Sequence, residues 1–154
     1  MLILSEILRI KTARRFFSIS CGDLQIGAIV SATMFHAEID ASKRVLTMSF
    51  SQHVDSAEMR SCREKVQSIL VDVEPGFRLL TDLTGLDSMD KECSTDLGEM
   101  MSLCDAKGIN AVVTVVPDPK KDIGFTILEP FHYGKHVEVM TYETLADAIQ
   151  SLVV

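Results

Sequence analysis

A polar segment in the middle of the chain concentrates the side chains that could bind or transform a ligand. Residues 79–101 read LLTDLTGLDSMDKECSTDLGEMM, where an apolar run gives way to acids and hydroxyls and then to a helical pattern. Such residues between a strand and a helix suit an anion site, a phosphorylation site, a catalytic centre or a helix cap. We expect Asp87, Ser88 or Asp90 to cap the helix, which leaves the other three uses open.

Enzymatic and metal-binding patterns are weak by comparison. An acid/base enzyme needs two carboxylates whose pKa values are pushed apart, and Asp82 with Asp90 is the obvious pair. The sequence contains no Gly-rich phosphate loop, no GxSxG and no HExxH. His132 and His136 are four residues apart, but Gly134 separates them, so we expect loop histidines rather than metal ligands. The sequence therefore predicts no enzyme, no metal site and no cofactor.

The composition is that of a globular protein. The 154 residues are 47% hydrophobic and 24% charged, which suits a single domain with one core. A net charge of -7 argues against nucleic acid and anionic membranes as partners. The sequence contains no stretch of about 18 consecutive apolar residues, so it predicts no membrane span. The four cysteines, Cys21, Cys62, Cys93 and Cys104, lack paired spacing, so we expect buried thiols in a reducing cytoplasm.

The first 33 residues differ in charge from the rest. Four bases and two acids give residues 1–33 a charge of +2, so the remainder carries -9. We therefore expect residues 1–33 to lie outside the compact domain, which spans residues 34–154. Three origins stay open for this segment: a weak twin-arginine export signal, a start assigned upstream of a true first residue at Met34, or an amphipathic helix.

Hydrophobic periodicity predicts an alternation of strands and helices. The expected elements are strands at 35–39 and 45–50, a helix at 55–73, a strand at 77–83, a helix at 93–104, a strand at 111–116, a helix at 118–131, a strand at 136–140 and a helix at 141–153. The first two strands form a hairpin, and Asp55 with Glu58 predicts a capping box on the first helix. The later strand–helix–strand unit predicts parallel strands.

The two C-terminal helices complete the prediction of an α/β fold. Asp118 is the expected N-cap of the first. In the first of these helices, the apolar residues Ile123, Ile127 and Phe131 are expected to share one side. In the second helix, Leu145, Ile149 and Leu152 are expected to pack inward.

Two stretches carry a resemblance to a known family. Asp82-Leu83-Thr84-Gly85 followed by Asp90, and the tail FTILEPFHYGKHVEVMTYETLADAI, resemble the STAS domain, named for sulphate transporters and anti-sigma factor antagonists, in its SpoIIAA-like form. The resemblance covers residues 34–153. It implies a mixed β-sheet of about five strands with helices chiefly on one face, and structural roles for Asp82 and Gly85 in the turn.

The sequence departs from the family at the position of its phosphorylated serine. Lys91 stands there, so the usual phosphorylation switch is expected to be absent, although Ser88, Ser94 and Thr95 are nearby hydroxyls. The resemblance implies a non-enzymatic, regulatory protein-interaction module of the bacterial cytoplasm that binds a protein partner. It also allows the chain to form a homodimer. The expected partner-binding surface comprises Asp87, Ser88, Asp90, Lys91, Glu92, Ser94, Thr95, Lys120 and Lys121.

A carrier of small molecules or lipids is the main alternative. That function needs an apolar pocket of about 300 Å³ or more. A core closed by Leu97, Phe125, Ile127 and Phe131 would exclude it.

Overall fold

A computed structural model describes residues 33–121 and 124–153 of the chain; the segment assigned to residues 1–33 therefore lies, except for Thr33, outside the described residues. The elements in chain order are β1 (Phe35–Asp40), β2 (Val45–Val54), α3 (Ser56–Leu70), β3 (Arg78–Met89), α4 (Cys93–Ala106), β4 (Ala111–Val115), the 3-10 helix η1 (Pro119–Lys121), α5 (Phe125–His132), β5 (Glu138–Tyr142) and α6 (Leu145–Val153).

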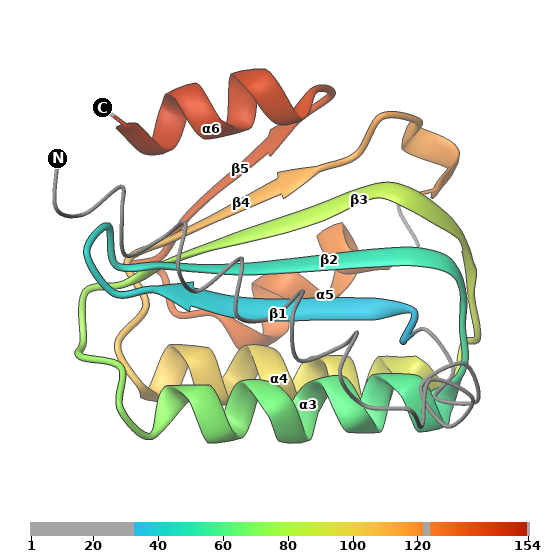
Figure 1. Cartoon of the computed structure of the whole chain (residues 1–154), viewed down its shortest axis with the longest axis horizontal. Coiled ribbons are helices and arrows are strands. Elements are labelled where there is room, and N and C mark those ends of the chain that lie inside the picture. The colour runs from blue at the N-terminus through green and yellow to red at the C-terminus, as the bar shows by residue number, and fades with distance from the viewer. Residues whose placement is uncertain (1–32, 122–123, 154) are drawn as a thin grey trace, which may run out of the picture. The chain divides into compact units, whose positions relative to one another are not determined.

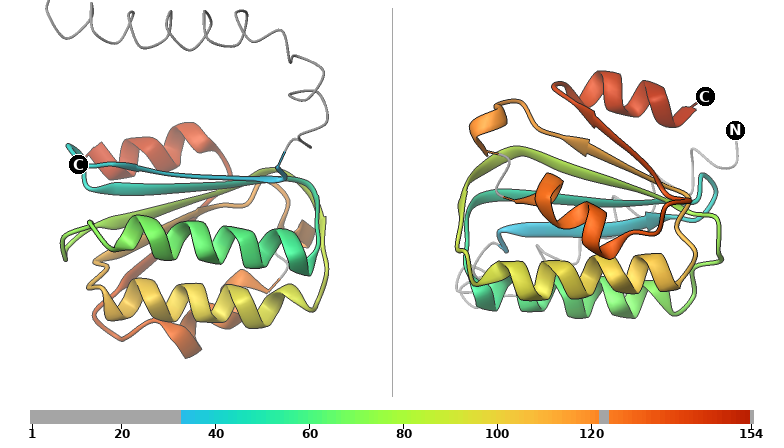
Figure 2. Two further views of the ribbon diagram at one scale, coloured as in Figure 1. Left: turned by 60° about the horizontal axis from the view of Figure 1, so that its bottom comes forward. Right: turned by 180° about the vertical axis from the view of Figure 1, so that it is seen from behind.

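The five strands form one mixed sheet in the order β1-β2-β3-β4-β5 (Figure 1). β1 pairs with β2 in the antiparallel sense, and the remaining neighbours are parallel. α3 and α4 cover one face together with α5, whereas α6 lies on the other face (Figures 1 and 2). The predicted α/β fold, with about five strands and helices chiefly on one face, is confirmed.

Two apolar clusters correspond to the two faces of the sheet. The larger one lies under α3, α4 and α5 and includes Met48, Phe77, Leu97 and Ile109. The smaller one lies under α6, where Ala148 and Leu152 pack on Val45 of β2, Leu80 of β3, and Val113 and Val115 of β4. Among the described residues, none of the helices has the length and hydropathy that crossing a bilayer requires.

The start of α3 follows the sequence prediction in part. The Asp55 side chain accepts a hydrogen bond from Glu58 N at 2.8 Å, so Asp55 is the N-cap. The Glu58 carboxylate does not return this bond but accepts one from Met34 N at 3.3 Å. The Glu58 side chain in the first turn of α3 therefore fixes the chain where it enters β1.

β3 is longer than the sequence predicts, which corrects the expected turn at residues 82–85. The strand continues to Met89 because β2 extends to Val54 and pairs with it along the whole length. Leu83, Leu86 and Met89 all point into the larger core. The register shifts between Ser49 and Ser51 and again after Gln52, and at each shift β3 carries one extra residue.

The outward faces of α5 and α6 correct the expected orientation of several apolar residues. Ile127 and Phe131 are 70% and 79% exposed, and Phe125, Glu129 and Tyr133 face the core instead. On α6, Leu145 and Ile149 are 38% and 47% exposed, so of the three expected residues Leu152 alone is buried. On each helix, the exposed apolar residues and the inward-facing residues both recur at helical spacing. Packing against the sheet decided which of the two sets is buried. Ile123 lies outside the described residues.

Candidate functional site

The site predicted from the sequence lies where β2 and β3 end and α4 begins. Ser88 and Asp87 are exposed at the end of β3, Asp90 follows the strand, and Lys91 with Glu92 forms the turn into α4. Ser94 and Thr95 are exposed in the first turn of that helix. The carboxyl ends of parallel strands meet at one edge of a sheet, which brings residues of β2 into the same site.

His53 from β2 joins two of these residues. Its Nδ1 lies 2.6 Å from Ser88 Oγ, and its Nε2 lies 3.2 Å from Asp90 Oδ1. The sequence assigned no partner to His53, because Ser88 and Asp90 are more than thirty residues away in the chain. No local pattern signals such a contact.

The local backbone explains how His53 reaches Ser88. The preceding residue, Gln52, has φ of +56°, in the left-handed region that few non-glycine residues adopt. The register shift lies between Gln52 and His53, and pairs His53 with Ser88. Bulges of this kind turn a side chain away from the direction that a regular strand would give it.

The expected helix cap is wrong. The N-cap of α4 is Glu92, and its side chain makes no capping hydrogen bond. The chain instead enters the helix through a turn in which Cys93 N and Ser94 N donate to the carbonyl oxygens of Asp90 and Lys91, at 3.0 and 3.2 Å. Backbone carbonyls therefore satisfy amides that a side chain was expected to cap.

Cys93, at the first position of α4, has the environment of an inert thiol. It is fully buried, and its Sγ donates to Val54 O at 3.6 Å. Burial and the neighbouring Asp90 carboxylate raise the pKa of Cys93 to about 11. Cys62 and Cys104 are also buried and free, as the sequence predicts, and Cys21 lies outside the described residues.

The lysines that were expected to extend the surface come from η1. Lys120 is exposed, and its backbone N donates to Asp118 Oδ1 at 3.0 Å, so Asp118 caps η1 rather than the longer helix that was expected. η1 contacts β3, which places Lys120 at the same edge of the sheet as Ser88. The side chain of Lys121 lies outside the described residues.

Asp82 and Gly85 lie within β3 rather than in a turn. Asp82 Oδ1 accepts a hydrogen bond from Thr84 N at 2.9 Å and another from the Thr84 hydroxyl. A Cβ at Gly85 would lie 3.3 Å from Phe50 O, so the bulged strand approaches β2 closely there. Asp82 pairs with Ser49 and Met89 with Val54, five residues apart on β2, so Asp82 and Asp90 lie roughly 15–20 Å apart. They do not form a catalytic pair.

The histidines near the C-terminus have separate partners. Ser102 Oγ lies 2.8 Å from His132 Nδ1, whereas His136 Nε2 lies 3.9 Å from Asp105 Oδ1. Within the described part of the chain, no group of three or more His, Cys, Asp or Glu side chains is placed to hold a metal ion.

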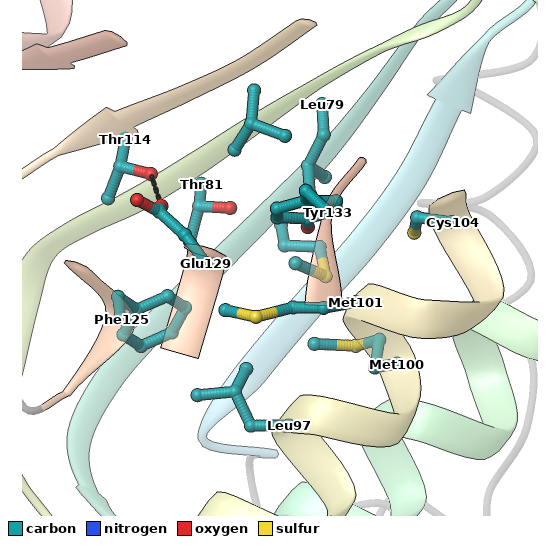
Figure 3. Close-up of a pocket in the computed structure, with 12 residues that line it drawn as sticks. Leu79, Thr81, Leu97, Met100, Met101, Cys104, Thr114, Phe125, Glu129 and Tyr133 are labelled. Atoms are coloured by element: carbon teal, nitrogen blue, oxygen red, sulfur yellow. Dashed lines mark hydrogen bonds between the residues drawn. The ribbon is translucent and has the colours of Figure 1, made fainter. Parts of the chain in front are cut away.

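The space under α5 is too small for a carried ligand. Figure 3 shows this cavity, in which Glu129 points toward Thr114 and Thr114 Oγ1 donates to Glu129 Oε1 at 3.4 Å. The cavity has a volume of about 10 Å³, roughly that of one water-sized probe. Leu97 and Phe125 line it, whereas Ile127 and Phe131 are exposed and take no part in closing it.

An open groove lies at the opposite edge of the sheet. It has a volume of about 660 Å³ between the end of α3 and the turn that joins β1 to β2. Ile39, Ile69 and Phe77 supply apolar surface, and Arg44 lies among its polar residues. The Arg44 guanidinium donates to Pro75 O at 2.6 Å.

Comparison with known proteins agrees with this architecture. No protein-family model matches the sequence. No curated protein matches it either. The chain is similar to a solved uncharacterized protein with a SpoIIAA-like fold from Shewanella loihica PV-4, with 17% identity, 79% of this chain and 96% of the other covered, and a TM-score of 0.61.

Two anti-sigma factor antagonists have similar structures. One is SpoIIAA in its unphosphorylated form, with 19% identity, 77% and 97% of the two chains covered, and a TM-score of 0.52. The other comes from Mycobacterium paratuberculosis, with 18% identity, 80% and 98% covered, and a TM-score of 0.51. The chain therefore has a SpoIIAA-like fold.

Proposed function

We propose that this chain is a non-enzymatic regulatory module that binds a protein partner at the edge formed by the end of β3, the start of α4 and η1. The observation that carries the proposal is a set of polar residues at the carboxyl end of a parallel sheet, of which Asp90 is half-buried and the others are exposed: Asp87, Ser88, Asp90, Lys91, Glu92, Ser94 and Thr95. The similarity of fold to anti-sigma factor antagonists supports a protein partner. A cytoplasmic location belongs to the same proposal.

Lys91 distinguishes this surface from a phosphorylation switch. A lysine cannot accept phosphate from a serine kinase, and it adds a positive charge beside Asp90 and Glu92. A phosphate on Ser94 or Thr95 would lie in the first turn of α4, where the helix dipole favours negative charge. Modification of either residue would therefore be tolerated by the helix, but the proposed binding does not require it.

The exposed residues of α5 supply an apolar contact on the helix that packs along α4, whose start belongs to the polar surface. α5 packs along α4, since His132 lies against Gly98 and contacts Ser102. Ile127 and Phe131 face away from that contact and are exposed. A partner that covered them would bury an apolar centre next to a polar rim, as in many protein interfaces.

Affinity capture from the source cell tests the proposal. The full chain serves as bait beside Lys91→Glu and Asp90→Lys, with Lys65→Glu as the matched control because Lys65 is exposed on α3, away from this edge. We expect one protein to be retained by the parent and by Lys65→Glu and lost with the other two variants, all with unchanged thermal unfolding. Equal retention by all four would move the interface elsewhere.

A carrier function is the second candidate, and the open groove beside Arg44 is the observation that favours it. Its volume lies within the range of known small-molecule sites. Native mass spectrometry of the purified chain discriminates the two, because a carrier is expected to retain a small molecule. An Ile69→Asp variant should then lose it.

A further inference from the structure

We propose that Ser88 is a nucleophile that accepts an acyl group from an activated ester or thioester, with His53 as its base and Asp90 as the residue that positions His53. This inference goes beyond partner binding and does not depend on it. Nucleophilic serines are recognised by a hydrogen-bonded base that a third group orients. The distances of 2.6 Å from Ser88 Oγ to His53 Nδ1 and 3.2 Å from His53 Nε2 to Asp90 Oδ1 meet this description.

The carboxylate decides which nitrogen of His53 accepts the proton. An ionised carboxylate can only accept, so Asp90 favours the tautomer with its proton on Nε2. Nδ1 then carries the lone pair, and the Ser88 hydroxyl donates to it. The two nitrogens have exchanged the roles that they play in most serine hydrolases, but either nitrogen can serve as a base.

The reaction balances without a cofactor. Ser88 Oγ attacks the carbonyl carbon of the ester, and its proton passes to His53 Nδ1. The bond between the carbonyl carbon and the leaving oxygen or sulfur breaks, and the leaving group takes the electron pair. His53 then gives up its proton to the leaving group or to water. The product is an ester on Ser88, and nothing is oxidised or reduced.

Local charge favours a neutral acyl donor over a phosphoryl donor. Asp87, Asp90 and Glu92 surround Ser88 in the chain, with Lys91 as the only base between residues 82 and 106. These three carboxylates outnumber Lys91 and the Lys120 that lies at the same edge, so the net local charge favours a neutral carbonyl compound over a polyanionic phosphate ester. Ser88 and His53 are both exposed, so such a compound can reach them.

The chain contains its own control. Ser102 Oγ lies 2.8 Å from His132 Nδ1, which repeats the serine–histidine contact. No carboxylate in the described part of the chain lies within ion-pair distance of His132, so the third member is missing there. If the carboxylate matters, Ser88 should react and Ser102 should not.

p-Nitrophenyl acetate tests the proposal on the full chain, read by release of p-nitrophenolate and by peptide mass spectrometry. We expect one acetyl group per chain on Ser88, none after Ser88→Ala, and an unchanged rate for Ser102→Ala. His53→Gln should slow acetylation by about 100-fold, the lower end of general-base effects. Asp90→Asn should slow it and Asp90→Glu should restore it, as expected for a positioning residue.

Two results would overturn the assignment. One is acetylation of the parent no faster than that of Ser88→Ala. The other is acetylation of Ser88 at the parent rate in His53→Gln. Both readouts remain valid whether or not a protein partner is found, because they use the isolated chain. Ser88, His53 and Ser102 are exposed and Asp90 is half-buried, so we expect thermal unfolding to stay unchanged and to confirm that each variant is folded.

Discussion

The imidazole of His132 lies directly on Gly98. A Cβ at residue 98 would be 2.6 Å from His132 Nε2 and 2.8 Å from its Cε1, closer than side chains approach one another. The absence of a side chain in the middle of α4 is therefore what lets the end of α5 pack against it, with Ser102 as the polar contact of the ring.

This contact predicts a coupling between residues 98 and 132. In a helix, alanine is more favourable than glycine by about 1 kcal/mol. We expect Gly98→Ala to stabilise the His132→Ala protein by about 0.5–1 kcal/mol, and to give no gain or a loss in the parent, where the ring must move. Urea denaturation of the four proteins measures the difference. An equal gain in both backgrounds would show that the ring does not limit residue 98.

Two glycines with positive φ allow the cost of backbone strain to be distinguished from the cost of a steric clash, because an added Cβ would clash at only one of them. Gly108 has φ of +92° and a Cβ there would lie 2.9 Å from Pro75 Cβ, whereas Gly124 has φ of +85° and no described atom within 4 Å. Left-handed geometry costs alanine about 1–2 kcal/mol at either position. We expect Gly108→Ala to destabilise the protein by about 1–3 kcal/mol more than Gly124→Ala, measured by chemical denaturation. Equal costs would mean that Pro75 moves freely.

The inward and outward phenylalanines of α5 should differ sharply in their effect on stability. Phe125 is 3% exposed and its ring centroid lies 6.2 Å from that of Phe50, whereas Phe131 is 79% exposed. We expect Phe125→Ala to cost about 3–5 kcal/mol. Phe131→Ala should stay within about 0.5 kcal/mol of the parent. A large cost for Phe131→Ala would place that ring in the core and remove it from the proposed interface.

Buried thiols predict a loss of stability at alkaline pH. Burial raises the pKa of Cys62 and of Cys104 from the ordinary value of 9.0 to about 12. The unfolded chain ionises these thiols near pH 9 and the folded protein keeps them protonated, so the folded state binds more protons between these values. The free energy of unfolding is therefore unaffected below pH 9 and falls as pH rises toward 12, by up to about 1.4 kcal/mol per pH unit for each thiol.

Denaturation curves at about pH 8, 9 and 10 measure this slope. Cys104→Ala lowers stability throughout by leaving a cavity, but its slope should be shallower than that of the parent because one raised pKa is gone. A slope that is the same in both proteins would assign the alkaline loss to other groups.

The sequence by itself determined the elements whose signals are local. Asp55 accepts from an amide three residues away, and the stripe from Met59 to Val66 needs only the 3.6-residue period. The continuous β-branched residues of β4 predicted a strand covered on both faces, as observed. Each of these features depends on neighbours within one or two turns, so it could be read before the fold was known.

Tertiary structure decided the extent of β3 and the membership of the site. Residues 84–89 became a strand because β2 supplied the hydrogen-bonding partner, and their own sequence reads as a turn. The short α5 has apolar residues all round, so its period could not choose between Phe125 and Phe131 for the core. His53 contacts Ser88 because of the bulged pairing between β2 and β3. The two residues are 35 positions apart, so no local sequence pattern predicts their contact.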